Sequence, residues 1–337
     1  MSAAVLSLPL IAVLTGKVQR AMEFIVHIGA HRCASTTFQR YLRSNAAALR
    51  AQGGGFWGPG RTRKGGLLSG IVEGNAGAVP PSAMQAAQAR IDSALYLAEA
   101  RGVSHVVLSD ENMLGSVRRN LRARALYPDA GPRLAHHARA FGGKVRRIVL
   151  SIRALDTFWE SAMAFGVERG HPLPDEASLG VIANNPRGWR EVITEIAQAF
   201  PGVELQVQGF EALAGQPDRR LALALGGAIE PPVENARLWL NRAPDLARLR
   251  TVLAQRGDDP ARLPEGAGRW RPFSDAQAAT LREIHADDLF WLRAGADGMA
   301  TYFEEDTPDQ AGKNLPGGAN AKGQDDDGKD GRMARTG

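Results

Sequence analysis

Cysteine is almost absent from this sequence, which carries one in 337 residues, at position 33. One cysteine excludes an internal disulfide and a zinc site built from several cysteines, and it fits a reducing compartment. Apolar runs of membrane-spanning length are also missing. Residues 3–14 are apolar but number about twelve, whereas a bilayer-spanning helix takes about twenty. We therefore expect a cytoplasmic protein without stable membrane insertion.

The rest of the composition is that of a folded, globular chain. With 44% hydrophobic residues, a chain of this size can bury a large core. Residues 1–21 lack the leading basic charge of a secretory signal, so we expect a disordered extension or an upstream start before Met22, with a weak signal or anchor as the alternative. Residues 304–337 are polar and aperiodic, which predicts a disordered tail. The folded domain is expected over residues 22–303.

Positive charge is in moderate excess, with a net charge of +5 and an isoelectric point near 9.6. Such a balance is compatible with nucleic-acid binding, but no known nucleic-acid motif is present. We expect small polyanions as ligands and no nucleic-acid partner. Composition does not determine the oligomeric state.

The most informative segment is residues 24–43, FIVHIGAHRCASTTFQRYLR. A β-branched and aromatic run of strand length ends at Gly29, and helical spacing of apolar residues begins after Ser35. A strand that enters a helix through such a tight loop directs free backbone N–H groups and the positive end of the helix dipole toward one point. Residues 29–35, called the anion loop below, are therefore predicted to bind an anion, most often phosphate.

The anion loop differs from the loop of nucleotide triphosphatases. That motif requires Gly-Lys-Ser/Thr after Gly and four residues, whereas Ala34, Ser35 and Thr36 occupy those places here. A cation precedes them instead, at Arg32. The order cation, small residue and hydroxyl cluster resembles the 5′-phosphosulfate loop of sulfotransferases that use 3′-phosphoadenosine 5′-phosphosulfate (PAPS). Arg32 replaces the family's usual Lys, and Cys33 replaces a hydroxyl.

A second segment, residues 145–170, strengthens the resemblance. An apolar strand precedes Arg153, and Ser161 follows eight residues later, about two helical turns along. In sulfotransferases an Arg and a Ser with this separation hold the 3′-phosphate of PAPS. The late segment 266–273, GAGRWRPF, loosely resembles the family's loop that closes on the nucleotide. The cofactor-binding residues that the resemblance implies are Gly29, Arg32, Cys33, Ala34, Ser35, Thr36, Thr37, Arg153, Ser161, Arg269 and Arg271.

Sulfuryl transfer also requires a base for the acceptor hydroxyl. A buried strand is predicted at residues 105–109, and Asp110 and Glu111 follow it directly. Ligands of open α/β sheets bind beyond the carboxyl ends of the strands, so these carboxylates are expected on the same edge as the anion loop. We predict Glu111 as the general base, with Asp110 second and His105 a distant third. The alternative is that Glu111 only orients cations of the loop.

The glycine-rich stretch at residues 52–77 is predicted to be a long loop. As a flap over the acceptor, it would use Trp57 to stack on a sugar and Arg61, Arg63 and Lys64 to hold an anionic group. The alternative is a solvated surface loop. Elsewhere, periodicity predicts a strand at 203–207, a helix capped by Ser82, a helix opened by the capping box of Ser274 with Gln277, and further helices at 186–200, 217–226 and 244–256.

Together these patterns predict a three-layer α/β/α domain with a mainly parallel sheet and a phosphosulfate-binding strand-loop-helix. The resemblance implies a PAPS-dependent sulfotransferase in which Arg32 is catalytic and no metal is required. The acceptor is an unknown hydroxyl compound, for which a carbohydrate is favoured. The alternatives are a nucleotide-binding protein of the same fold with impaired catalysis and, with less support, a P-loop kinase.

Overall fold

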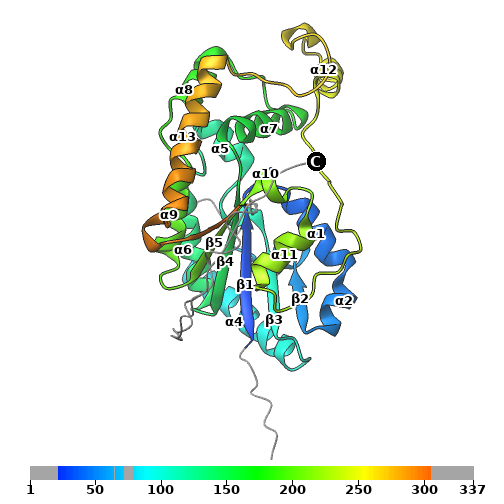
Figure 1. Cartoon of the computed structure of the whole chain (residues 1–337), viewed down its shortest axis with the longest axis vertical. Coiled ribbons are helices and arrows are strands. Elements are labelled where there is room, and N and C mark those ends of the chain that lie inside the picture. Colours follow the sequence, from blue (N-terminus) through cyan, green and yellow to red (C-terminus); the bar gives the residue numbers. More distant parts are fainter. Residues whose placement is uncertain (1–21, 64, 72–78, 305–337) are drawn as a thin grey trace, which may run out of the picture. The chain divides into compact units, whose positions relative to one another are not determined.

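The chain folds around one parallel β-sheet, seen in a computed structural model that describes residues 22–63, 65–71 and 79–304 (Figure 1). Its strands lie in the order β2-β3-β1-β4-β5-β6, and every neighbouring pair is parallel. Helices cover both faces, which confirms the predicted α/β/α fold. The strands are β1 (Glu23–Gly29), β2 (Gly54–Trp57), β3 (His105–Ser109), β4 (Val145–Ile152), β5 (Glu204–Gly209) and β6 (Thr301–Phe303).

Alternate residues of the strands feed two hydrophobic cores. Ile25 faces a smaller core with Phe38 and Leu221, whereas Phe24 and Val26 face the larger core. The smaller core is covered by α1 (Ser35–Ser44), α2 (Ala46–Ala51) and α11 (Pro217–Leu225). The larger core is covered by α4 (Pro81–Glu99), α6 (Ala130–Phe141) and α9 (Trp189–Ala199).

A further group of helices gathers beyond the carboxyl ends of the strands, in the upper part of Figure 1. Here α7 (Leu155–Glu168) contacts three others: α5 (Val117–Ala123), α12 (Leu246–Gln255) and α13 (Asp275–Arg293). The chain also forms α8 (Glu176–Ala183) and the short turns α3 (Pro59–Thr62), η1 (Glu111–Met113), α10 (Phe210–Leu213), η2 (Pro260–Arg262) and η3 (Ala296–Gly298). The helices that pack around α7 therefore lie at the edge of the sheet at which the site is predicted.

Most local predictions are confirmed. The four predicted strands correspond to β1, β3, β4 and β5, and the Ser274 hydroxyl caps α13 while Gln277 returns a bond to the Ser274 N–H. The cap predicted at Ser82 is wrong. Pro80 is the N-cap of α4 and Pro81 occupies its first turn, where the missing N–H of proline has no cost. The predictions for residues 1–21 and 305–337 lie outside the described residues.

The long loop predicted at residues 52–77 is wrong for its first part, which forms β2 and α3. At Gly54, an added Cβ would lie 3.0 Å from the carbonyl oxygen of Leu49. Glycine therefore lets α2 approach the strand, although glycine lowers strand propensity. Trp57 is buried against the ring of Phe24, with centroids 5.7 Å apart, so Trp57 does not form a sugar platform. Lys64 and residues 72–78 lie outside the described residues.

Within the part of the chain that the structure describes, no helix combines the length and the apolar character needed to cross a bilayer.

The burial of Trp57 is testable through stability. Replacing it by alanine should lower the free energy of unfolding by about 3–5 kcal/mol, because a large side chain leaves the core. Urea denaturation of the wild type and of Trp57→Ala measures this loss. Tyr96→Ala is the control, since Tyr96 is 71% exposed on α4 and its loss should change stability by less than about 0.5 kcal/mol. Equal stability of Trp57→Ala and the wild type would contradict the buried role.

Candidate functional site

The anion loop begins at a glycine that no other residue could replace without strain. Gly29 has φ +101°, and a Cβ built on it would lie 2.8 Å from the Cβ of Glu111. Both the left-handed backbone and the close approach require glycine here. Gly29 thus supports the site through its backbone and lets Glu111, two residues after β3, lie against the end of β1.

Farther along the loop, Arg32 and Ala34 adopt left-handed backbone conformations, with φ 62° and 61°. Left-handed residues that alternate with others are typical of concave, anion-binding turns. Helix α1 then begins at Ser35 without a side-chain cap on its first N–H groups. The Ser35 hydroxyl donates a hydrogen bond to the carbonyl of Ala30 across the loop, at 3.1 Å. The loop and the start of α1 therefore present N–H groups that can donate hydrogen bonds to an anion.

Arg153 is held against the anion loop by several contacts. Its guanidinium donates to the carbonyl oxygen of Arg32 at 3.1 Å and lies 4.4 Å from the centroid of the Phe210 ring. The indole N–H of Trp189 donates to the Arg153 carbonyl oxygen at 2.7 Å, which fixes the backbone at the end of β4. From α7, Ser161 accepts a hydrogen bond from the Arg32 side chain at 3.0 Å. The two sequence motifs thus meet, although they are more than one hundred residues apart.

The two motifs line one cavity of about 530 Å³, called the loop cavity below. This volume lies within the range of ordinary small-molecule sites. Aromatic side chains at Phe165, Phe210 and Trp239 form parts of its wall. The predicted site residues that line it are Arg32, Ala34, Ser35, Thr36, Glu111, Arg153, Ser161 and Arg269.

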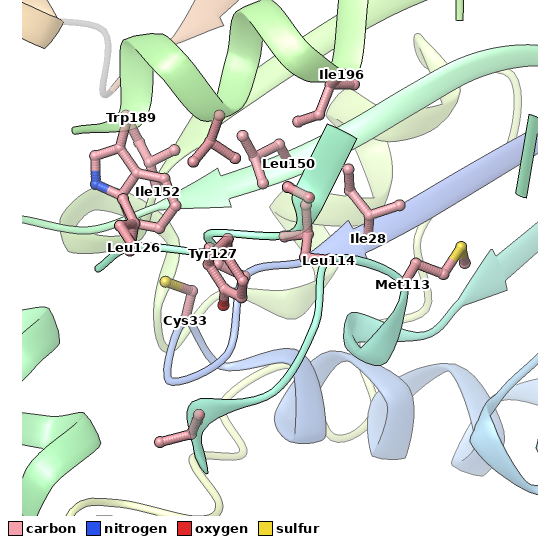
Figure 2. Packing of buried hydrophobic residues seen from close by; sticks show 14 of the residues in the cluster. Ile28, Cys33, Met113, Leu114, Leu126, Tyr127, Leu150, Ile152, Trp189 and Ile196 are labelled. Carbon is pink, nitrogen blue, oxygen red and sulfur yellow. The ribbon is translucent and has the colours of Figure 1, made fainter. Parts of the chain in front are cut away.

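The other predicted site residues do not line the loop cavity: Gly29, Cys33, Thr37, Asp110 and Arg271. Figure 2 shows the Cys33 side chain in the core beside Tyr127. Burial raises the pKa of the Cys33 thiol to about 12, so the thiol is protonated at neutral pH. Its backbone still belongs to the anion loop.

Thr37 instead holds residues 232–245, called the strap below, in which no sequence motif predicts a site residue. The Thr37 hydroxyl accepts a hydrogen bond from the N–H of Leu240 at 3.0 Å, and the Arg32 guanidinium donates to the carbonyl oxygen of Asn241 at 3.1 Å. Residues 239–245 of the strap form one wall of the loop cavity. No local sequence pattern predicts the position of the strap, because long-range hydrogen bonds to α1 and to the anion loop determine that position.

Glu111 lies at the loop cavity and is tied to two neighbours. It accepts hydrogen bonds from the Gln39 amide at 2.8 Å and from the Arg63 guanidinium at 3.0 Å. Burial acts to raise the pKa of Glu111, but His31, Arg63 and backbone hydrogen bonding outweigh it and lower the pKa to about 2. Glu111 is therefore ionised at neutral pH. These contacts also fit the alternative in which Glu111 orients a cation.

Asp110 is buried away from the cavity. It forms an ion pair with Arg63 at 2.6 Å and accepts hydrogen bonds from the Thr62 hydroxyl and from the Asn112 N–H. These bonds connect the end of β3 to α3, so Arg63 contacts both carboxylates rather than an acceptor. The position of Asp110 is that of a structural carboxylate. His105 lies at the opposite end of β3, away from this edge.

His31 lines the loop cavity and was missed as a site residue in its own right. Its backbone N–H donates to the Tyr127 hydroxyl at 2.8 Å, and its Nδ1 lies 3.0 Å from that same oxygen. Its Nε2 lies 3.1 Å from Oδ1 of Asn112. Burial lowers the pKa of His31 in spite of the nearby Glu111. A neutral ring that donates from Nε2 and accepts at Nδ1 satisfies this whole network.

Positive charge dominates the bottom of the loop cavity. Burial, Arg153 and Arg169 lower the pKa of Arg32 to about 10, and burial also lowers the pKa of Arg153. Arg269 reaches the cavity from the late loop and pairs with Glu160 at 3.6 Å. Like charges held close together in a partly buried place are stabilised by a bound anion. Among the described residues, no cluster of three or more His, Cys, Asp or Glu side chains is arranged to hold a metal ion.

No protein-family model matches the chain, and no curated protein is found to be similar to it. The site geometry and the sequence motifs therefore carry the functional assignment.

The low pKa of Glu111 predicts a specific acid sensitivity. Its folded-state pKa lies below the ordinary value of 4.5, so ionised Glu111 stabilises the fold above pH 4.5, and this contribution is lost as the pH falls toward 2. Between pH 5 and pH 3 the wild type should lose on the order of 1–2 kcal/mol more than Glu111→Gln does. Urea denaturation at several pH values measures the difference.

The control for this experiment is Glu99→Gln, which removes an exposed carboxylate at the end of α4. It should keep the pH dependence of the wild type. If Glu111→Gln also keeps that dependence, Glu111 does not carry the stabilising charge.

Proposed function

We propose that this protein is a PAPS-dependent sulfotransferase that transfers a sulfuryl group to an acceptor hydroxyl. The observation that carries the proposal is the meeting of the anion loop with Arg153 and Ser161 in one cavity. The anion loop would hold the 5′-phosphosulfate, and Arg153 with Ser161 would hold the 3′-phosphate. The aromatic rings of Phe210 and Trp239 would flank the adenine. A cytoplasmic location is part of the proposal.

In the reaction, the acceptor oxygen attacks sulfur in line. A bond forms from that oxygen to sulfur, the bond from sulfur to the bridging phosphate oxygen breaks, and adenosine 3′,5′-bisphosphate leaves with the electron pair. Charge on the phosphate and sulfuryl oxygens would be stabilised by the donors at the anion loop: the loop N–H groups, the Arg32 guanidinium and the Thr36 hydroxyl. As in phosphoryl transfer, positioning and electrostatics supply most of the catalysis.

The acceptor proton would pass to Glu111, whose carboxylate lies at the cavity. A pKa of about 2 makes Glu111 a weak base, but it is fully ionised and needs no prior loss of a proton. A loose transition state, as described for phosphoryl transfer, makes little demand on the nucleophile. Gln39 and Arg63 hold the carboxylate in place. A carbohydrate acceptor stays the favoured choice, now without a role for Trp57.

A second candidate is a nucleotide-binding protein of this fold with impaired catalysis. The observation in its favour is that the Arg32 guanidinium donates to Ser161 and to the Asn241 carbonyl, so it must exchange these bonds to reach a sulfuryl group. A wild type without transfer activity that becomes active as Arg32→Lys would favour this candidate.

Binding of adenosine 3′,5′-bisphosphate tests the proposed site directly. Calorimetric titration should give micromolar affinity in the wild type and a loss of about 10- to 100-fold in Arg153→Ala, because a charge-assisted hydrogen bond to phosphate is removed. The matched control is Arg139→Ala, which removes an exposed arginine on α6 that does not line the cavity. No binding, or a preference for ATP with Mg²⁺, would overturn the sulfotransferase proposal.

The role of Glu111 is tested by kinetics, with slow transfer from PAPS to water as the measured reaction. Glu111→Gln should lower kcat by no more than about 10²-fold, the low end for a positioned general base because a group with a pKa of about 2 is a weak base, while the affinity for adenosine 3′,5′-bisphosphate stays within a few-fold. Because the pKa of Glu111 is about 2, kcat/KM should show no acid limb between pH 5 and pH 8. An acid limb in that range would point to a histidine base, and unchanged kcat would assign Glu111 to orienting Arg63.

A further inference from the structure

A second cavity, of about 890 Å³, lies beside the loop cavity. It is lined by α5, α7, the turn after α7 and α8. Phe165 is the one residue that lines both cavities among the described residues. The second cavity, called the basic cavity below, therefore meets the loop cavity at the Phe165 side chain.

Arginines dominate the charge of the basic cavity. Its lining includes Arg118, Arg122, Arg124 and Arg169, against one carboxylate, Asp175. That carboxylate is already engaged, because it caps α8 by accepting from the Ser178 N–H at 2.8 Å. His171 also lines the cavity, but burial, Arg118 and Arg122 lower its pKa, so it is neutral near pH 7. The cavity thus carries a net positive charge that arginines supply.

Two of these arginines are arranged at a cost to α5. Arg118 and Arg122 are four residues apart on this helix and share one face, where like charges destabilise a helix by a few tenths of a kcal/mol. Their neighbour Arg119 points elsewhere and pairs with Asp129 at 2.6 Å. Within the described residues, neither Arg118 nor Arg122 forms an ion pair. An anion in the cavity would relieve this repulsion.

The ring of Phe165 is in contact with an arginine from each cavity. The guanidinium of Arg32 lies 4.7 Å from the ring centroid, and that of Arg169 lies 3.6 Å from it. One arginine of the anion loop and one of the basic cavity therefore contact the same ring. Phe165 is therefore the place at which a ligand of the basic cavity would lie nearest to the anion loop.

The remaining lining of the basic cavity is apolar. Leu121, Met163 and Ile182 contribute side chains, and prolines at positions 172 and 174 border the turn after α7. An apolar floor beneath cationic side chains suits a ligand with an apolar face and an anionic group. Sugar rings present such a face, and guanidinium groups bind carboxylate and sulfate through paired hydrogen bonds.

We propose that the basic cavity is the acceptor site and that the acceptor is an anionic carbohydrate, with a carboxylate or sulfate group held by Arg118 and Arg122. This inference rests on the proposed sulfotransferase function and specifies its substrate class. The acceptor hydroxyl would enter the loop cavity beside Phe165 while the anionic group stays on α5.

A matched pair of probes tests the charge requirement: 4-nitrophenyl β-D-glucuronide and 4-nitrophenyl β-D-glucoside. They differ only at C6, which is a carboxylate in the glucuronide and a hydroxymethyl group in the glucoside. Titrations by saturation-transfer NMR at low salt should show about tenfold tighter binding of the glucuronide to the wild type, as expected for one charge-assisted hydrogen bond. In Arg118→Gln/Arg122→Gln this preference should fall below about twofold. Equal affinity of both probes for the wild type, or no binding of the glucuronide, would overturn the proposal.

The control variant is Arg139→Gln, an exposed arginine on α6 that lines neither cavity, and it should keep the tenfold preference. The double variant should unfold at the same or a higher urea concentration than the wild type, because a like-charge pair is removed. Titration of the same samples with adenosine 3′,5′-bisphosphate separates the two proposals. If the wild type binds the nucleotide but does not prefer the glucuronide, only the acceptor proposal is overturned. If the wild type prefers the glucuronide but does not bind the nucleotide, the sulfotransferase proposal is overturned, and the basic cavity is then a site for an anionic sugar rather than an acceptor site.

Discussion

The parallel pairing of β1 with β3 on one side and β4 on the other is the constraint on which the site depends. His27 of β1 lies beside Ser109 of β3, and Gly29 lies beside Leu150 of β4, so the three strands end at the same edge of the sheet, staggered by a few residues. The residues that follow these ends are the anion loop, Glu111 and Arg153. Side chains that are far apart in the sequence thus share one edge, without any need for the loops to reach toward one another.

Concentrating cations at this edge of the sheet has an energetic cost. Below the anion loop, the fully buried Arg220 donates to the carbonyl oxygen of Cys33 at 2.9 Å, and burial lowers the pKa of Arg220 to about 10. Burying a guanidinium without a carboxylate is unfavourable. An anion above the loop would offset part of that cost, so stability and ligand affinity are coupled at this place.

Helix α7 connects the two cavities. Ser161 faces the loop cavity, Arg169 at the end of the helix faces the basic cavity, and Phe165 between them lines both. These residues are four apart, which places them on one side of the helix. A change in the tilt or rotation of α7 would therefore affect both cavities together. The indole of Trp189 resists such a change near the start of α7, because it holds the backbone of Arg153.

The sequence by itself determined the features that depend on neighbouring residues. Strand-length apolar runs, helical periodicity and the capping box at Ser274 predicted most elements, and the strand-loop-helix at Gly29 predicted an anion site. Only the tertiary structure decided the rest. Gly54 in β2 follows from the close approach of α2, the inward turn of Cys33 from core packing, and the strap from long-range bonds to Thr37. Local propensity carries no information on such contacts, because they form between segments that only the folded chain brings together.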